Sequence, residues 1–374
     1  MIVKTVTGKY SEAKIFTDNV EDYALAQVKL ICDQKGAEGS VIRLMPDVHP
    51  GKVGPIGLTM TVNDTVLPNI VGIDIGCGIT IAKLKQRKLE YQKLDTVIRE
   101  RIPSGFRIRS KPHRIAESFP FEELKCYRHI SLDRIMRSMG SLGGGNHFIE
   151  ADCGEDGSLY VVIHSGSRHL GKEVAEYYLN QGQRILKEQG IDIPYELTYL
   201  TGSLMEDYLH DQCVVQSFAS QNRAAMLDEL EKGMKLKVEE EYSCIHNYIE
   251  ISTDYKMLRK GAISAKSGEK VIIPINMRDG VILGIGKGNS DWNDSAPHGS
   301  GRILKRTDVQ NHYTVSNYKK EMKGIYSSCI GKDTLDEAPF AYRGLSEIAE
   351  AISDTVEIQQ IIKPVYNFKA GSNE

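Results

Sequence analysis

Residues 69–79 carry the side chains whose types and spacing are best suited to chemistry. The apolar part of this segment predicts a short buried strand, which delivers a carboxylate at Asp74 and a thiol at Cys77, with glycines on both sides of the thiol. A thiol and a carboxylate together suit a divalent metal of intermediate softness better than they suit a hydrophobic core. We therefore expect a metal site at the end of this strand.

Three histidines in polar or glycine-rich surroundings offer further ligands. His147 ends a Gly-Gly-Gly-Asn-His stretch, His164 follows an apolar run, and His246 precedes an asparagine. Taken singly, each is more often an ordinary histidine, and a lone cysteine is usually just buried. Together with Asp74 and Cys77 they make five donors, enough for two metal ions if the thiolate bridges them. Two neighbouring ions are typical of phosphoryl-transfer sites.

His298 stands in a different setting, a Pro-His-Gly-Ser-Gly-Arg segment. Its backbone N–H groups, hydroxyl and guanidinium suit an anion such as phosphate. An imidazole there is able to attack a nucleotide α-phosphate and form a phosphoramidate, or it only hydrogen-bonds phosphate. Asp47, in a Met-Pro-Asp-Val-His turn, is the candidate carboxylate to hold the imidazole in one tautomer, although the sequence does not show whether the two meet.

The composition is that of a globular protein outside the membrane. Of the 374 residues, 41% are hydrophobic and 26% are charged, and the net charge of -3 gives no global reason to bind nucleic acid. A local basic stretch at 103–135 is either a solvated loop or a surface for a phosphate backbone. Seven cysteines without a framework indicate a reducing compartment, and neither a signal pattern nor a long apolar run is visible, so we expect a cytoplasmic protein.

The periodicity of apolar residues predicts alternating helical and strand-rich regions. Because the metal-type residues come from two strand-rich halves, we expect one α+β domain over 1–374 with a helical insertion at about 169–240. The predicted helices are 19–36, 88–102, 169–190, 205–235 and 343–354, and the predicted strand-rich regions are 41–82, 159–163, 271–285 and the apolar run 361–368.

The motifs, in this order, resemble the RtcB family of RNA ligases. The resemblance covers about 40–369 and rests on the segments 45–49, 74–78, 143–148, 164–168, 246–248, 298–302 and 336–339. It implies a domain of mixed and antiparallel sheets around a central metal site. It also implies a ligase that uses GTP and two manganese ions to join an RNA 3′-phosphate or 2′,3′-cyclic phosphate to a 5′-hydroxyl, in RNA repair or tRNA splicing.

The resemblance also implies roles for single residues. His298 resembles the histidine that carries GMP, and Asp47 the carboxylate that orients it. The residues that match the two-manganese site, with Cys77 bridging, are Asp74, Cys77, His147, His164 and His246.

Other matching residues are expected to contact the substrates. Glu150 would accept guanine N–H donors and Tyr342 would stack on the base. The full set of expected nucleotide contacts is Asn146, Phe148, Glu150, Asn247, Ser300, Gly301, Tyr342 and Lys369. Arg168 and Arg302 are the candidates for gripping RNA phosphate.

Two features set the chain apart from the family's main branch, and two other functions compete. The chain is short, and residues 284–290 stand where the main branch has a Ser-Met-Gly turn, so Lys287 is a candidate to replace contacts of that turn. The competitors are a metal-dependent phosphodiesterase or cyclic-phosphate hydrolase, which needs no His298, and a module that only binds RNA ends or nucleotide. A monomer is the default, and an archease-type activator is a possible partner.

Overall fold

A six-stranded sheet forms one side of the protein, whose computed structural model describes residues 4–371. Its order is β1-β2-β3-β4-β10-β9, and all neighbours are antiparallel except β2 and β3. The strands are β1 (Lys4–Thr7), β2 (Glu12–Ile15), β3 (Val41–His49), β4 (Ile56–Thr61), β10 (Lys256–Lys260) and β9 (Asn247–Ile251).

A seven-stranded antiparallel sheet forms the other side, in the order β12-β13-β15-β6-β7-β5-β8. The strands are β12 (Lys270–Asn276), β13 (Gly280–Gly286), β15 (Val356–Lys369), β6 (Phe148–Cys153), β7 (Leu159–Ser165), β5 (Gly78–Leu84) and β8 (Val238–Ile245).

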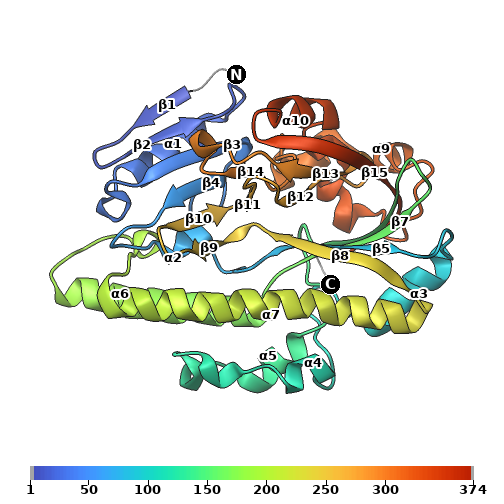
Figure 1. The fold of residues 1–374 in the computed structure, drawn as a ribbon, viewed down its shortest axis with the longest axis horizontal. Coiled ribbons are helices and arrows are strands. Elements are labelled where there is room, and N and C mark those ends of the chain that lie inside the picture. The colour runs from blue at the N-terminus through green and yellow to red at the C-terminus, as the bar shows by residue number, and fades with distance from the viewer. Residues whose placement is uncertain (1–3, 372–374) are drawn as a thin grey trace.

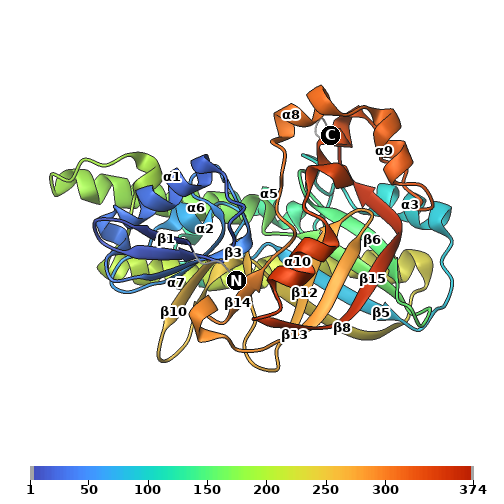
Figure 2. The same cartoon turned by 90° about the horizontal axis from the view of Figure 1, so that it is seen from above.

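The chain crosses between the two sheets at His246, which is the single residue between β8 and β9. A two-stranded sheet of β11 (Ala262–Ser264) and β14 (Ser295–Pro297) also lies at this junction, where it contacts β3 and β4 on one side and β8 on the other. Figure 2 shows β14 between the N-terminal strands and the C-terminal strands.

Two long helices support the sheets from one side, and the longer of them reaches both sheets. These are α6 (Arg168–Glu188) and α7 (Gly202–Met234), which lie side by side beneath the strands in Figure 1. At 33 residues, α7 is about 50 Å long, enough to pass under β9 of one sheet and β5 and β7 of the other. The shorter helices are α1 (Asp22–Cys32), α2 (Pro68–Val71), α3 (Tyr91–Arg101), α4 (Arg114–Glu117), α5 (Leu132–Ser138), α8 (Arg306–His312), α9 (Val315–Glu321) and α10 (Leu345–Ala351).

Apolar burial joins these helices to the sheets. One core packs Ile31 of α1 and Phe218 of α7 with the six-stranded sheet, and a second packs Ile98 of α3 and Met226 of α7 with Phe368 of the seven-stranded sheet. Because α7 contributes to both cores, the two sheets are parts of one α+β domain, as predicted. Within residues 4–371, no helix combines the length and the apolar character that crossing a membrane requires.

Most of the predicted elements are present. The helices at 19–36, 88–102, 169–190, 205–235 and 343–354 correspond to α1, α3, α6, α7 and α10. The buried strand predicted within 69–79 is wrong, because Pro68–Val71 form the one-turn helix α2 and the strand begins only at Gly78. Pro68 favours the first helical turn, and the positive φ angles of Gly72 (88°) and Gly76 (73°) turn the chain before β5.

Arg223 of α7 holds the ends of β5 and β7 together from beneath. Its side chain is fully buried, and it donates to the carbonyl oxygens of Gly76 (3.0 Å) and Ser165 (2.9 Å) and to the hydroxyl of Thr80 (3.0 Å). A guanidinium suits this task because its planar fork presents several donors at once. The loop before β5 is therefore fixed by a residue remote in sequence.

We expect Arg223→Met to lower the free energy of unfolding by about 2–4 kcal/mol, because two buried carbonyl groups lose their charged donor. Urea unfolding followed by circular dichroism measures this loss. The matched control is Arg184→Met on α6, where the side chain is exposed and its contact with Glu188 is a surface pair. Equal stability of the two variants would contradict the anchoring role.

Candidate metal centre and nucleotide cavity

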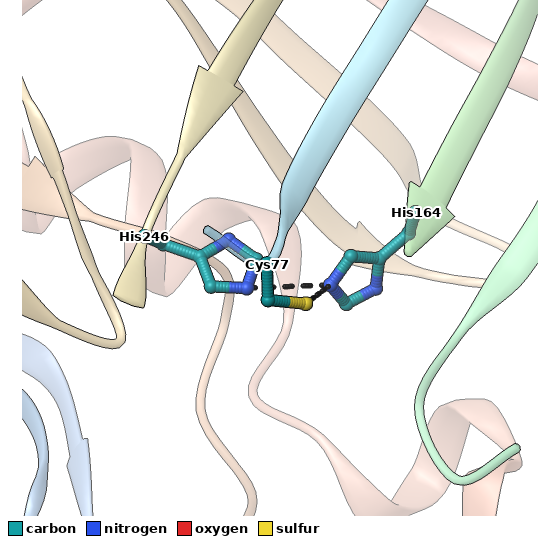
Figure 3. A group of neighbouring side chains, drawn as sticks. All are labelled: Cys77, His164 and His246. Atoms are coloured by element: carbon teal, nitrogen blue, oxygen red, sulfur yellow. Dashed lines mark hydrogen bonds between the residues drawn. The ribbon is translucent and has the colours of Figure 1, made fainter. Parts of the chain in front are cut away.

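Sheet register brings three candidate ligands to one point. In the seven-stranded sheet, β5 lies between β7 and β8, with Gly78 opposite both Ser165 and Ile245. Cys77 precedes β5, His164 lies near the end of β7, and His246 follows β8, so their side chains meet at the same edge. Figure 3 shows these three side chains pointing toward one another.

The remaining two candidates join the cluster through Cys77. Its Sγ lies 3.4 Å from Nε2 of His147 and 3.4 Å from Nε2 of His164. His147 Nε2 lies 3.1 Å from Asp74 Oδ2, and His164 Nε2 lies 3.3 Å from His246 Nε2. The ligand atoms form two groups, each within 4.8 Å: Cys77, His164 and His246, and Asp74, Cys77 and His147. Cys77 belongs to both, which is the position required of a bridging thiolate.

Backbone carbonyl groups orient two of the imidazoles. His147 Nδ1 lies 2.8 Å from the carbonyl oxygen of Leu142, and His164 Nδ1 lies 3.1 Å from that of Asn146. Each Nδ1 therefore carries the proton and donates it, and each Nε2 directs its lone pair into the cluster. This arrangement fixes the tautomer that a metal ligand needs.

The protonation states also suit a cation. Burial lowers the pKa of His164 and His246 well below the usual range, so both imidazoles are neutral. Burial raises the pKa of Asp74, but contacts with His147, Cys77 and Arg168 outweigh it and the pKa is lowered overall. Burial raises the pKa of the Cys77 thiol, whose proton a divalent cation would displace. A carboxylate, a thiolate and three imidazoles form a donor set that suits divalent ions of borderline softness.

Gly143 allows the loop before His147 to pack against Arg168. The φ angle of Gly143 is 86°, and a Cβ atom there would lie 2.0 Å from Nη1 of Arg168 and 2.8 Å from Nδ1 of His147. Arg168 in turn donates to the hydroxyl of Ser141 (3.1 Å) and the carbonyl oxygen of Gly105 (3.0 Å). Glycine is thus required for the ligand loop to reach its position.

His298 and Asp47 meet beside this cluster. His298 Nδ1 lies 2.8 Å from Oδ2 of the fully buried Asp47, so the ring donates from Nδ1 and its Nε2 keeps a lone pair. The His298 ring centroid is 4.8 Å from that of His246. The candidate nucleophile and its predicted orienting carboxylate are therefore in contact, next to a metal ligand.

A cavity of about 590 Å³ opens beside His298. Its lining includes most of the predicted substrate contacts: Asn146, Phe148, Glu150, Ser300, Gly301, Arg302, Tyr342 and Lys369. Asn247 is not part of that lining. Its side chain donates to the carbonyl oxygen of Asp74 (3.4 Å) and accepts from the N–H of Gly261 (3.0 Å), so it supports the loop that carries a metal ligand. Lys287 also lies elsewhere and donates to the carbonyl oxygen of Ser353.

Glu337 organises the cationic side of the cavity, and the sequence analysis did not identify it as a site residue. The ammonium of Lys369 and the hydroxyl of Tyr342 each lie 2.6 Å from its Oε2, and Nη1 of Arg302 lies 3.3 Å from its Oε1. Burial raises the pKa of Glu337, but the charges of Lys369, Arg306 and Arg302 outweigh it and lower the pKa to about 2. The sequence shows the motif at 336–339 that contains Glu337, but it does not show the cationic residues that contact Glu337 in the fold.

A second cavity, of about 410 Å³, opens at the other end of the metal cluster. Asp74, Arg168 and Lys172 line it together with the 83% exposed side chain of Phe106. A guanidinium, an ammonium and an aromatic face are the groups that bind single-stranded nucleic acid. Of the two predicted RNA contacts, Arg168 lies here, whereas Arg302 lies in the nucleotide cavity.

Comparison with known proteins places the chain among RNA ligases. A family model described as "tRNA-splicing ligase RtcB" matches residues 27–125 and 114–370. The chain is 28% identical to "RNA-splicing ligase RtcB1" of Escherichia coli strain ATCC 25922, over 98% of this chain and 99% of the relative. It is 27% identical to "RNA-splicing ligase RtcB" of E. coli K12 over the same shares. It is 26% identical to "tRNA-splicing ligase RtcB" of Aeropyrum pernix, over 94% of this chain and 92% of the relative.

We expect Cys77→Ala to lose both metal ions, because Cys77 contributes to both ligand groups. His147→Ala should mainly lose one ion and His164→Ala the other. Elemental analysis of the purified variants measures the metal content. Cys213→Ala changes an exposed cysteine and should keep both ions. If Cys77→Ala retains two ions, the assignment of Cys77 as a ligand of both ions is wrong.

Asp152 gives the fold an unusual pH dependence. It is fully buried on β6, neither carboxyl oxygen has a hydrogen-bond partner among the described residues, and burial together with the charge of Glu150 raises its pKa. A carboxyl with a raised folded-state pKa binds its proton more tightly when folded. Stability is therefore lost as pH rises above the unfolded-state value of about 4 toward the folded-state pKa.

Asp152→Asn should reduce this loss, since the amide does not ionise. Urea unfolding at pH 5 and pH 8 provides the comparison. Asp192→Asn, in an exposed loop, should leave the pH dependence of the parent protein unchanged. If the free energy of unfolding falls by the same amount between pH 5 and pH 8 in the parent protein and in Asp152→Asn, the assignment is wrong.

Proposed function

This chain belongs to the tRNA-splicing ligase RtcB family and is an RNA ligase; we propose that it joins RNA 3′-phosphate or 2′,3′-cyclic phosphate ends to 5′-hydroxyl ends with GTP, through GMP carried on His298. The observation that carries this proposal is the contact of His298 with both Asp47 and His246. It puts an oriented nucleophile between the nucleotide cavity and the candidate metal centre. Two manganese ions held by the five ligands would stabilise charge that develops on phosphoryl oxygens.

The first step uses the lone pair on Nε2 of His298. It attacks the α-phosphorus of GTP, an N–P bond forms, the P–O bond to the β-phosphate breaks, and pyrophosphate leaves. Asp47 keeps the proton on Nδ1 and stabilises the positive ring. Glu150 accepts from N1–H and the exocyclic amine of guanine, and Tyr342 offers an aromatic face to the base.

The later steps transfer and then release GMP. An oxygen of the RNA 3′-phosphate attacks the GMP phosphorus, and His298 leaves as a neutral imidazole. The 5′-hydroxyl then attacks the 3′-phosphorus of the activated end, a phosphodiester forms and GMP departs. A 2′,3′-cyclic phosphate is first opened by water to the 3′-phosphate. Arg168, in the second cavity, is placed to contact the RNA phosphates.

A metal-dependent phosphodiesterase that opens cyclic phosphates is the main competing function. It would need the metal ligands but no buried carboxylate behind His298 and no large nucleotide cavity next to that histidine. A module that only binds RNA ends has even less need of an oriented nucleophile. The Asp47–His298 pair and the cavity therefore favour ligation.

The biological setting forms the remaining part of the proposal. The relatives' names refer to RNA splicing and tRNA splicing. We assign this chain to tRNA splicing or RNA repair in the cytoplasm, acting as a monomer, with an archease-type protein as its candidate activator. The pathway and the activator follow from the family, and the compartment follows from the cysteine content and the lack of a signal pattern.

We expect His298→Ala to abolish the covalent GMP adduct and the joining of 3′-phosphate to 5′-hydroxyl RNA, because the nucleophile is gone. Incubation with labelled GTP and manganese, followed by a denaturing gel and peptide mapping at alkaline pH, detects the adduct. RNA already activated with GMP should still be sealed. Asp47→Asn should slow adduct formation while keeping the metal.

His312→Ala, on the exposed face of α8, serves as the histidine control and should form the adduct normally. Metal analysis of His298→Ala should show both ions still bound. GMP mapped to a lysine or to another histidine would refute the role of His298. Efficient opening of cyclic phosphates without any adduct in the parent protein would favour the phosphodiesterase.

A further inference from the structure

Asn367 of β15 lies directly opposite Glu150 of β6 in the antiparallel ladder. Opposed residues in such a ladder present their side chains on the same face. The Asn367 side chain is fully buried, and its Nδ2 donates to Oε2 of Glu150 over 2.6 Å. Its backbone N–H donates to the carbonyl oxygen of Tyr326 (2.9 Å), which fixes the residue from the other side. Asn367 is thus a rigid partner of Glu150.

The orientation of the Asn367 amide follows from the chemistry of its partner. The amide nitrogen donates to Glu150 in the structure, so the amide oxygen faces away from that carboxyl. That oxygen, Oδ1, is buried and has no hydrogen-bond partner among the described residues. A buried acceptor without a donor is costly, and such groups in a native protein often await a ligand.

Asn367 and Glu150 both line the nucleotide cavity. The nearby ammonium of Lys369 pairs with Glu337. Asp152, the next residue on the same face of β6, lies opposite Pro364 and is not part of the cavity lining. The molecule that fills the cavity is therefore the candidate source of a donor for Asn367.

The available acceptors match the donors of one nucleobase. The Watson–Crick edge of guanine offers N1–H and an exocyclic amine with two hydrogens. Hypoxanthine offers N1–H alone, and adenine presents an acceptor at N1. Glu150 already receives one hydrogen bond from Asn367, so Glu150 and the free oxygen of Asn367 together provide acceptors for all three guanine donors.

We propose that Asn367 determines guanine specificity together with Glu150: its nitrogen positions the Glu150 carboxylate, and its oxygen accepts one hydrogen of the exocyclic amine. This inference rests on the proposed use of GTP, and it adds a residue that recognises the exocyclic amine of guanine. A site built to accept from an amine rejects an analogue that lacks it, because the buried acceptor is then left unpaired.

Equilibrium binding of nucleoside monophosphates tests the inference without requiring catalysis. GMP, IMP and AMP carry the three bases but have no pyrophosphate to lose, so His298 forms no adduct with them. Calorimetric titration of the manganese-loaded full chain should show GMP binding more than about tenfold more tightly than IMP, because about tenfold is expected for each lost hydrogen bond to a buried acceptor and IMP loses the one to Asn367 and the one from the amine to Glu150. AMP should bind more weakly than both.

Asn367→Leu removes both polar atoms at similar size and should reduce the preference for GMP over IMP about tenfold, while Glu150 still accepts the other hydrogen of the amine. Gln359→Leu is the matched control on the same strand, because Gln359 is exposed and its side chain donates to Glu357, away from the cavity lining. It should keep the ratio of the parent protein. Circular dichroism and metal content verify that each variant is folded.

The outcomes separate this inference from the proposed function. Equal binding of GMP and IMP by the parent protein overturns the role of Asn367, whatever the variant does. If Asn367→Leu binds both GMP and IMP more weakly but keeps the ratio of their dissociation constants, the side chain only positions Glu150. That result also overturns the proposed role of Asn367 in specificity. AMP binding as tightly as GMP removes guanine specificity altogether. A preference for GMP over IMP that Asn367→Leu reduces, in a protein that forms no adduct with GTP, upholds Asn367 and refutes the ligase mechanism.

Discussion

The rest of the site depends on the placement of one buried thiol at the start of β5. Cys77 is the residue shared by the two groups of candidate ligands, so both groups must converge on its sulfur atom. That convergence is achieved by sheet register, because β7 and β8 flank β5 and end beside it. Arg223 then fixes the loop before β5 by donating to Gly76 and to the end of β7. Helix α7 therefore supports the metal centre although it supplies none of the five ligands.

Buried charges outside the metal cluster follow the same logic of complete pairing. Glu337 is surrounded by Lys369, Arg302 and Arg306, and an isolated carboxylate at that depth would be costly. This pairing also restrains the cationic groups that face the nucleotide cavity. Asn367 and Asp152 are exceptions, because the hydrogen bond of Asn367 to Glu150 leaves its Oδ1 unused and neither carboxyl oxygen of Asp152 has a partner among the described residues. Of these two residues only Asn367 lines the nucleotide cavity, and for that reason its unused acceptor points to a ligand.

The sequence shows which residues flank each candidate ligand, but it does not show which distant residues each ligand contacts in the fold. Cys77, His147 and His298 stand in glycine-rich segments, and glycine is needed where backbone approaches a ligand closely. The contact of Asp47 with His298 joins residues 251 positions apart, and the sequence could only suggest it. Glu337 and Asn367 escaped notice because their roles arise from tertiary contacts and strand register. The strand predicted within 69–79 failed because Pro68 and two glycines with positive φ override the apolar pattern.

The order of the side chains explains how two substrates can reach one centre. His298 contacts His246, His246 contacts His164, His164 contacts Cys77, and Cys77 leads through His147 to Asp74. The nucleotide cavity opens on the His298 end of this series, and the second cavity opens on the Asp74 end. An in-line displacement needs the attacking and leaving groups on opposite sides of phosphorus. A candidate metal centre with a cavity at each end offers the two groups separate approaches, and the sheets determine where these six side chains lie.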